Sequence, residues 1–96
     1  MDLATLKSEH FRPHKGTPFT FHHEGGALEM VLHLIEEGPN SERAGGSFSV
    51  IWAGPKAPAL PQSTYRIEHA ALGATEIFVV PIGQSGDHAL YEAVFN

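Results

Sequence analysis

Short apolar runs separated by glycine and proline constrain the fold of this chain more than any other feature. The 96 residues include 10 glycines and 7 prolines, and most of these lie between the apolar stretches and separate them. Short apolar runs at regular spacing, bounded by turn residues, are typical of an all-β sandwich or barrel. A chain of this length forms one domain, so we expect a single domain over residues 1–96, and no internal repeat is evident in it.

The clearest predicted element is a hairpin whose two-residue turn is Gly25-Gly26, because glycines supply the positive φ angles that such turns need. With this turn, apolar residues of the two strands face one another on one surface and polar residues on the other. The apolar pairs are Phe21–Met30 and Phe19–Leu32, and one polar pair is His22–Glu29. A slip of one residue would mix the two surfaces, so the pattern fixes which side faces the core.

Four further strands follow the hairpin. The first has Phe48, Val50 and Trp52 on its inner side, and the third is apolar on both faces, which implies a central or doubly covered position. Loops are expected at Gly54-Pro55 and from Gly83 to Asp87. The predicted strands run over residues 48–52, 63–69, 76–82 and 89–95.

A short helix is expected over residues 2–10, with Asp2 as its N-cap. Pro13 disfavours helical geometry at the preceding residue, so the helix should end by about there. Two turns are not stable alone in water, and the helix should therefore cover one end or edge of the sheet. The predicted fold is mainly β: a six-stranded antiparallel meander that curls into a small barrel, with one short N-terminal helix.

Composition excludes several classes of protein. The absence of cysteine excludes disulfide scaffolds, thiolate metal sites and a cysteine nucleophile. The formal charge is −5 and the basic residues are scattered, so we expect neither nucleic acid nor an anionic membrane as a partner. No apolar run approaches the ~20 residues of a membrane-spanning helix. A cytoplasmic protein without a cofactor is the expectation.

The 7 histidines do not form a metal-binding pattern. His10 and His14 have helical spacing, but Pro13 interrupts it. His22 and His23 point to opposite faces of a strand, and the predicted register places His33 about 13 Å from His22. We therefore expect no native metal.

No catalytic constellation is evident either. Ser63 and His69 lie about 20 Å apart along one strand, too far for a triad with Asp87. Glu36 and Glu37 alternate faces at the end of a strand. The chain is therefore not expected to be an enzyme.

One group of residues is a candidate binding site. Tyr65 and His69 share a face of one strand, and Gln62 directly precedes that strand. If this face is the interior, these polar groups are either satisfied by the fold or form a polar spot for a ligand or a partner side chain. Tyr91 and Glu92 could join them from the last strand. The single tryptophan, Trp52, is either a core residue or an interface contact.

Several strand and turn motifs can be compared with other proteins. They are Phe48-Ser49-Val50 with Gly54-Pro55, Gln62-x-x-Tyr65-x-Ile67-x-His69, Leu72-Gly73, Ile77-Phe78-Val79-Val80-Pro81-Ile82-Gly83 and the ending Tyr91-Glu92-Ala93-Val94-Phe95-Asn96. From Phe11 onward the chain resembles a family of small, uncharacterised bacterial proteins. Relatives near phage-tail-collar or fibre-type proteins imply an interaction role, and the family supplies no catalytic residues.

Two functions are compatible with the sequence. The first is a non-enzymatic interaction or assembly module, in which a protein partner or a homodimer covers the apolar residues left on the outside of the last two strands. The alternative is a small-ligand-binding barrel in which Gln62, Tyr65 and His69 provide the polar contacts.

Overall fold

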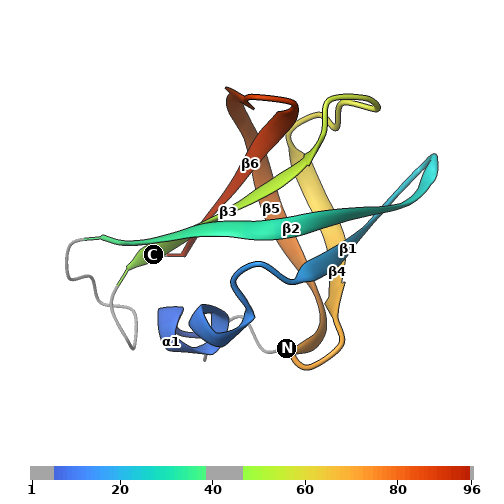
Figure 1. The fold of residues 1–96 in the computed structure, drawn as a ribbon. Helices are drawn as coiled ribbons and strands as arrows, with labels where there is room; N and C mark the ends of the chain where they lie inside the picture. The colour runs from blue at the N-terminus through green and yellow to red at the C-terminus, as the bar shows by residue number, and fades with distance from the viewer. Residues whose placement is uncertain (1–5, 39–46, 96) are drawn as a thin grey trace.

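Six antiparallel strands close into a barrel, and one short helix lies below them (Figure 1). The computed structural model describes residues 6–38 and 47–95. The predicted class, a six-stranded antiparallel barrel with a short N-terminal helix, is confirmed. The elements are α1 (Ser8–Phe11), the 3₁₀ helix η1 (Arg12–His14), β1 (Pro18–His23), β2 (Gly26–Glu37), β3 (Phe48–Pro55), β4 (Ser63–His69), β5 (Gly73–Ser85) and β6 (His88–Phe95).

The strand order departs from a simple meander at one connection. Around the barrel the order is β1-β2-β3-β6-β5-β4, so β3 and β4 are successive in sequence but are not neighbours. The loop that joins them carries the chain across one end of the barrel, and its residue Leu60 is buried there. The fold therefore consists of two three-stranded meanders whose outer strands pair with each other.

The first hairpin has the predicted faces but a different turn. The turn residues are Glu24 and Gly25, and Phe19 faces Met30 instead of Leu32. The register differs by two residues, which preserves the side of each residue in the paired part of the hairpin because side chains alternate with period two. Leu34, expected on the apolar inner side, instead lies outside because the register of β2 shifts between Leu32 and Leu34. Gly26, with φ of +125°, starts β2 instead of belonging to the turn.

The predicted helix boundaries are wrong. Asp2, the expected N-cap, lies outside the described residues, and Lys7 takes the N-cap position. The backbone N–H of Lys7 donates to Nδ1 of His10 at 2.9 Å, which fixes the start of α1. At the other end Arg12 is still helical despite the following Pro13, because η1 continues the chain as a tighter turn.

Two strands are longer than predicted. β3 continues through Gly54-Pro55, which we expected in a loop. Gly54 allows this because a Cβ at its position would come within 2.8 Å of Cγ of Met30, so only glycine permits the close packing. β5 extends from Gly73 to Ser85, and the turn that follows is Gly86-Asp87.

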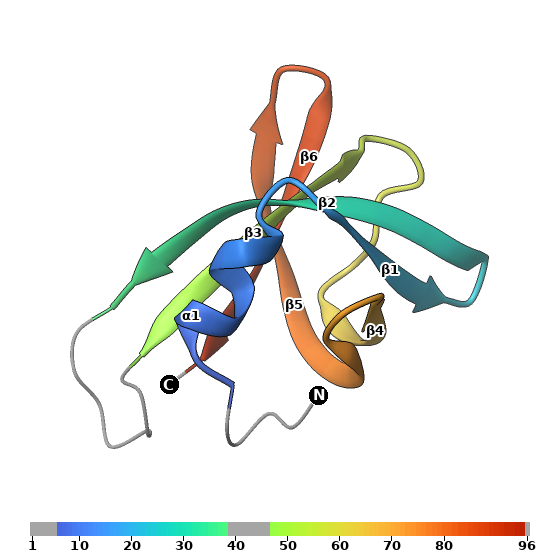
Figure 2. The same ribbon diagram turned by 60° about the horizontal axis from the view of Figure 1, so that its bottom comes forward.

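The two meanders repeat one plan, which the sequence analysis missed. β2 pairs with β1 over its first part and with β3 over its second, and β5 pairs in the same way with β4 and β6. Both long strands contain a register shift and are the longest ribbons in Figure 2. Each begins with the same four-residue pattern, Gly26-Ala27-x-Glu29 and Gly73-Ala74-x-Glu76.

Aromatic side chains fill the barrel as a continuous column. From Tyr65 the column passes through Phe21 at 6.3 Å between ring centres, then Trp52 at 5.1 Å, Phe19 at 5.6 Å and His69 at 4.3 Å. Trp52 is fully buried, with its ring edge-on to Phe21. The inward side of β3 is therefore the predicted one, and the tryptophan is a core residue.

α1 closes one mouth of the barrel. Phe11 is fully buried, and its ring lies within 6.3 Å of Phe19, 5.9 Å of Phe48 and 5.7 Å of Phe95. In Figure 2 the helix lies across the start of β3. This confirms the expectation that the helix covers one end of the sheet.

Candidate functional site

His69 is held by hydrogen bonds from three directions at the mouth that α1 closes. The backbone N–H groups of Ala71 and Leu72 donate to its Nδ1 at 3.0 and 3.3 Å. Nδ1 is therefore an acceptor, Nε2 carries the proton, and Nε2 donates to Oγ1 of Thr17 at 2.9 Å. The Thr17 hydroxyl in turn donates to the carbonyl oxygen of His14 at 2.6 Å.

The surroundings of His69 favour its neutral form. Burial lowers the pKa of this imidazole, and the nearby His14 lowers it further. The two rings lie 4.4 Å apart between centres. The burial and the neighbouring imidazole thus favour the same form that the hydrogen bonds require, the neutral ring with its proton on Nε2.

The two tyrosines hold the β3–β4 loop across the other mouth. The Tyr65 hydroxyl donates to the carbonyl oxygen of Pro61, and the Tyr91 hydroxyl accepts the N–H of Leu60 at 2.9 Å. Burial raises the pKa of Tyr65, with a smaller contribution from Tyr91. A groove of about 800 Å³ lies beside this loop, between it and the β1–β2 hairpin.

Of the predicted binding residues, the structure brings Tyr65 and Tyr91 together at the mouth that the β3–β4 loop crosses and places His69 elsewhere. Tyr65 and His69 lie four residues apart on β4, about 13 Å, and point to different mouths. Gln62 is exposed in the loop before β4. Tyr91 is buried in the core, whereas Glu92 points outward from β6.

Trp52 leaves one polar atom without a partner. Its indole Nε1 is buried and has no hydrogen-bond partner among the described residues. The rings of Phe21 and Phe19 pack against the indole, with their planes at 86° and 68° to its plane. Their π faces are weak acceptors, so this position suits packing and offers no polar contact to a ligand.

Two of the side chains considered above as metal-binding or catalytic groups, His22 and Glu37, make polar contacts within the fold. His22 pairs with Glu68 of β4, not with Glu29 as predicted. Within residues 6–38 and 47–95, no three histidine, aspartate or glutamate side chains are placed to hold a metal ion. Glu37 ties α1 to β2, since it accepts hydrogen bonds from Ser8 and from Arg12. These two bonds lower the pKa of Glu37.

The outside of β2, β3, β6 and β5 carries a largely apolar surface, which we call the outer face. Ladder pairing places its residues in rows across the four strands. The rows are Val31–Ala53–Leu90–Gly83, then Leu34–Ile51–Glu92–Val80, then Glu36–Ser49–Val94. Ile51 is only 6% exposed although it lies outside the core cluster, so neighbouring side chains on the outer face cover it.

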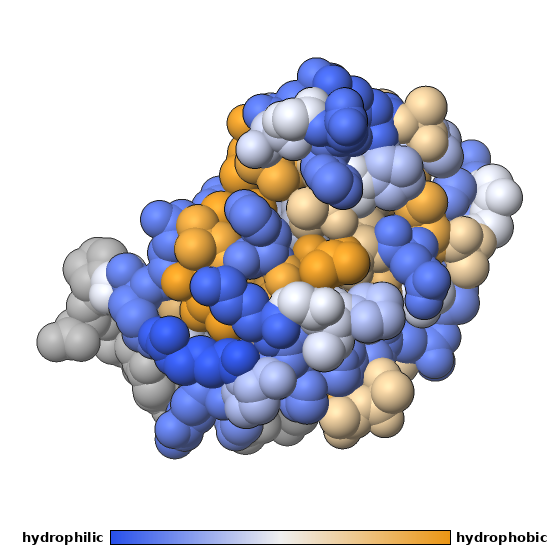
Figure 3. Space-filling view, viewed as in Figure 1, coloured by the Kyte–Doolittle hydropathy of each residue, from blue (hydrophilic) through white to orange (hydrophobic). Residues whose placement is uncertain are grey.

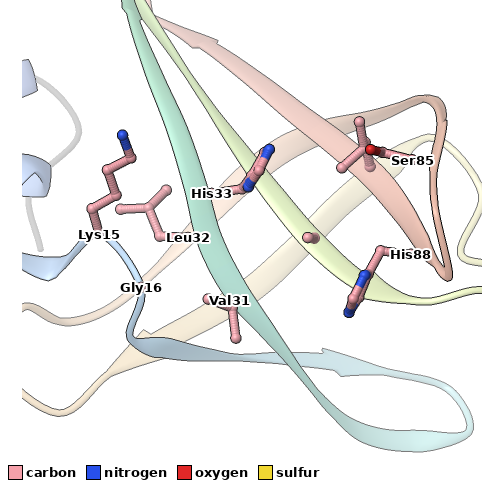
Figure 4. Close-up of a pocket in the computed structure, with 9 residues that line it drawn as sticks. Lys15, Gly16, Val31, Leu32, His33, Ser85 and His88 are labelled. Carbon is pink, nitrogen blue, oxygen red and sulfur yellow. The ribbon is translucent and has the colours of Figure 1, made fainter.

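A hollow of about 530 Å³ lies within the outer face, below the β5–β6 hairpin. Its apolar lining includes Val31, Ala53 and Leu90, while the polar side chains on its rim are basic or neutral: Lys15, His33, Ser85 and His88. Figure 4 shows that they come from β2, from the η1–β1 connection and from the β5–β6 hairpin. On the space-filling surface, apolar side chains gather on this side of the molecule around hollowed regions (Figure 3).

Comparison with known proteins assigns the chain to a family. Residues 6–95 match the sequence profile of a family described as a domain of unknown function, DUF6916. The chain belongs to this family. The match confirms the resemblance to an uncharacterised family. Neither a curated protein nor a solved structure matches this DUF6916 domain. In the part of the chain that the structure describes, no helix is both long and apolar enough to cross a membrane.

The hollow of this DUF6916 domain was not predicted. The sequence did indicate an apolar outer surface, because the last strands are apolar on both faces. In agreement, the exposed fractions of Phe78 and Val94 are 53% and 57%. His33 was examined only as a metal ligand. It reaches the rim of the hollow because it occupies the register shift of β2 between Leu32 and Leu34.

Proposed function

We propose that this DUF6916 domain is a non-enzymatic interaction or assembly module that binds a protein partner, or a second copy of the chain, through the outer face. The observation that carries the proposal is the apolar row Val31–Ala53–Leu90 together with the hollow beside it. Monomeric proteins rarely expose contiguous apolar patches larger than a few hundred Å². Burial of such a face against a partner is favourable by about 25 cal/mol per Å² of apolar surface.

The alternative function, a small-ligand-binding barrel, has less support. The hydrogen-bonding groups of Tyr65 and His69 are engaged within the fold. A ligand would have to displace these bonds and the aromatic column. The outer face needs no such rearrangement.

The setting of the domain is part of the same proposal. A bacterial source and a phage-tail-like assembly are implied by the resemblance, and a cytoplasmic location agrees with the absence of cysteine. The acidic net charge of −5 favours a protein partner over nucleic acid or an anionic membrane.

Site-specific photo-cross-linking in cells of the source organism tests the proposal. A photoreactive amino acid at Val31 or Leu90 is expected to give covalent adducts with one protein, and the adduct mass distinguishes a second copy from another partner. The same amino acid at Arg66, exposed on β4 away from the outer face, is the matched control. If neither outer-face position gives more adduct than Arg66, the proposal is wrong.

A further inference from the structure

The segment formed by α1 and η1 is attached to the barrel by contacts of different chemical kinds. Phe11 is buried among the aromatic rings of the mouth, and Glu37 bonds the start of the segment. At its end, the attachment runs through the chain from the His14 carbonyl to Thr17 and then to His69. The last of these bonds is donated by Nε2–H of His69, so it depends on the position of that ring.

Protonation of His69 would disrupt this attachment in two ways. A proton on Nδ1 removes the acceptor of the Ala71 and Leu72 N–H groups and points a donor at two donors, so the ring must turn away from them and its bond to Thr17 is lost. It also places a positive charge 4.4 Å, between ring centres, from the imidazole of His14, which is itself a titratable group.

No carboxylate among the described residues contacts His69 to offset a positive charge. The groups that face it are His14 from η1, the hydroxyl of Thr17 and the ring of Phe19 from β1. Lys15, between His14 and Thr17, adds a positive charge to the same segment. Among the described residues, no aspartate or glutamate forms an ion pair or hydrogen bond with His69.

We propose that His69 is a pH-sensitive latch: its neutral form favours the closed position of the α1–η1 segment over the mouth of the barrel, and its protonation in mildly acidic solution makes opening of the segment more frequent. Release frees Phe11 from the mouth and exposes the rings of Phe19 and Phe48 against which it packs. This device is independent of the outer face, and the proposed function does not depend on it. It would give the domain a second apolar surface that is exposed more often at low pH.

The size of the response follows from proton linkage. The closed form keeps His69 neutral, whereas in the open form the imidazole takes up its proton near its ordinary pKa of about 6.5. One proton taken up on opening raises the opening equilibrium constant about tenfold between pH 7.5 and pH 5.5. Below that range the response levels off only when the closed form is itself protonated.

Amide hydrogen exchange measures the latch directly. After correction for intrinsic exchange rates, the N–H groups of Lys15, Thr17 and Leu72 should exchange about tenfold faster at pH 5.5 than at pH 7.5 in the wild-type protein. His69→Asn places an amide oxygen near the position of Nδ1 and cannot titrate, so its corrected rates should be the same at both pH values. His33→Asn, an exposed histidine on the other side of β2, is the control and should respond as the wild type does.

Two results would overturn the latch: wild-type exchange that changes less than twofold between these pH values, or a tenfold response that persists in His69→Asn. If His69→Asn does not fold, NMR of the wild-type imidazoles decides. The exchange response must level off at the pH at which the ring of His69 titrates in the closed form. A response that levels off with the titration of another histidine contradicts the proposal.

Discussion

At the scale of single residues, the polar groups inside the barrel serve to join segments that are distant in sequence. Tyr91 and Leu60 are 31 residues apart, and Thr17 and His69 are 52 apart. The hydroxyl of Tyr91 gives the buried N–H of Leu60 its acceptor, whereas the hydroxyl of Tyr65 bonds a carbonyl on exposed Pro61. The two tyrosines should therefore differ in their importance for stability.

Replacing each tyrosine by phenylalanine measures that difference. Tyr91→Phe leaves a buried N–H without a partner and should lower the free energy of unfolding by about 1–3 kcal/mol. Tyr65→Phe should cost about 1 kcal/mol or less, because water can reach the Pro61 carbonyl. Urea denaturation of the two matched variants gives both values. An equal cost for both, or a larger one for Tyr65→Phe, contradicts this account.

At the scale of elements, α1 and η1 combine one deep apolar contact with exposed polar ones. Phe11 is fully buried, but the ion pair of Arg12 with Glu37 joins side chains that are both 52% exposed. Exposed ion pairs are screened by water and salt and contribute little. The ring of Phe11 should therefore provide most of the attachment of the helix.

Phe11→Ala and Arg12→Ala test this division. Phe11→Ala should lower the free energy of unfolding by about 3–5 kcal/mol, since it leaves a cavity among three aromatic rings. Arg12→Ala should cost about 1 kcal/mol or less. Thermal and urea unfolding measure both. A cost for Arg12→Ala as large as that for Phe11→Ala would show that polar contacts hold the helix.

The elements also show what could be predicted from sequence and what could not. The alternation of Tyr65, Ile67 and His69 with polar residues gave the bounds of β4 correctly, because period two is a local signal. The turn of the first hairpin lies one residue earlier than expected, because neither Glu24 nor Gly25 has a positive φ and the glycine that does, Gly26, begins β2. A pair of adjacent glycines does not by itself show which of them takes the positive φ.

The same limit applies to the candidate site. That Tyr65 and His69 share one face was correct, but their partners Pro61 and Thr17 are set by the loops that close the two mouths. Those loops have no periodic pattern. The hollow could not be predicted, because it depends on the register shift of β2 at His33. No residue pattern in the sequence around His33 indicates that shift.

At the scale of the whole molecule, the barrel is two copies of one three-stranded plan. The glycines that begin the long strands, Gly26 and Gly73, both have positive φ, +125° and +86°. The equivalent histidines His23 and His69 each accept a backbone N–H from two residues further on, at 3.1 and 3.0 Å. Equivalent positions should therefore respond alike to the same substitution.

Gly26→Ala and Gly73→Ala test this equivalence. Each forces a side chain into a backbone conformation that favours glycine, and each should lower the free energy of unfolding by about 1–3 kcal/mol. A Cβ at Gly26 would have no atom within 4 Å, so backbone strain is the only cost there. The double variant should lose the sum of the two within about 0.5 kcal/mol, because the sites are independent. A neutral effect in one half only would contradict the shared plan.

The pairing of β3 with β6, which joins the two three-stranded halves of the barrel, affects how a partner could recognise the domain. β3 of the first half lies beside β6 of the second along the whole of His88–Phe95, and this junction runs through the middle of the outer face. Neither half alone presents the row that crosses it. A partner that docks on this row would therefore bind only the fully folded domain. It would not bind a chain whose second half has not yet folded.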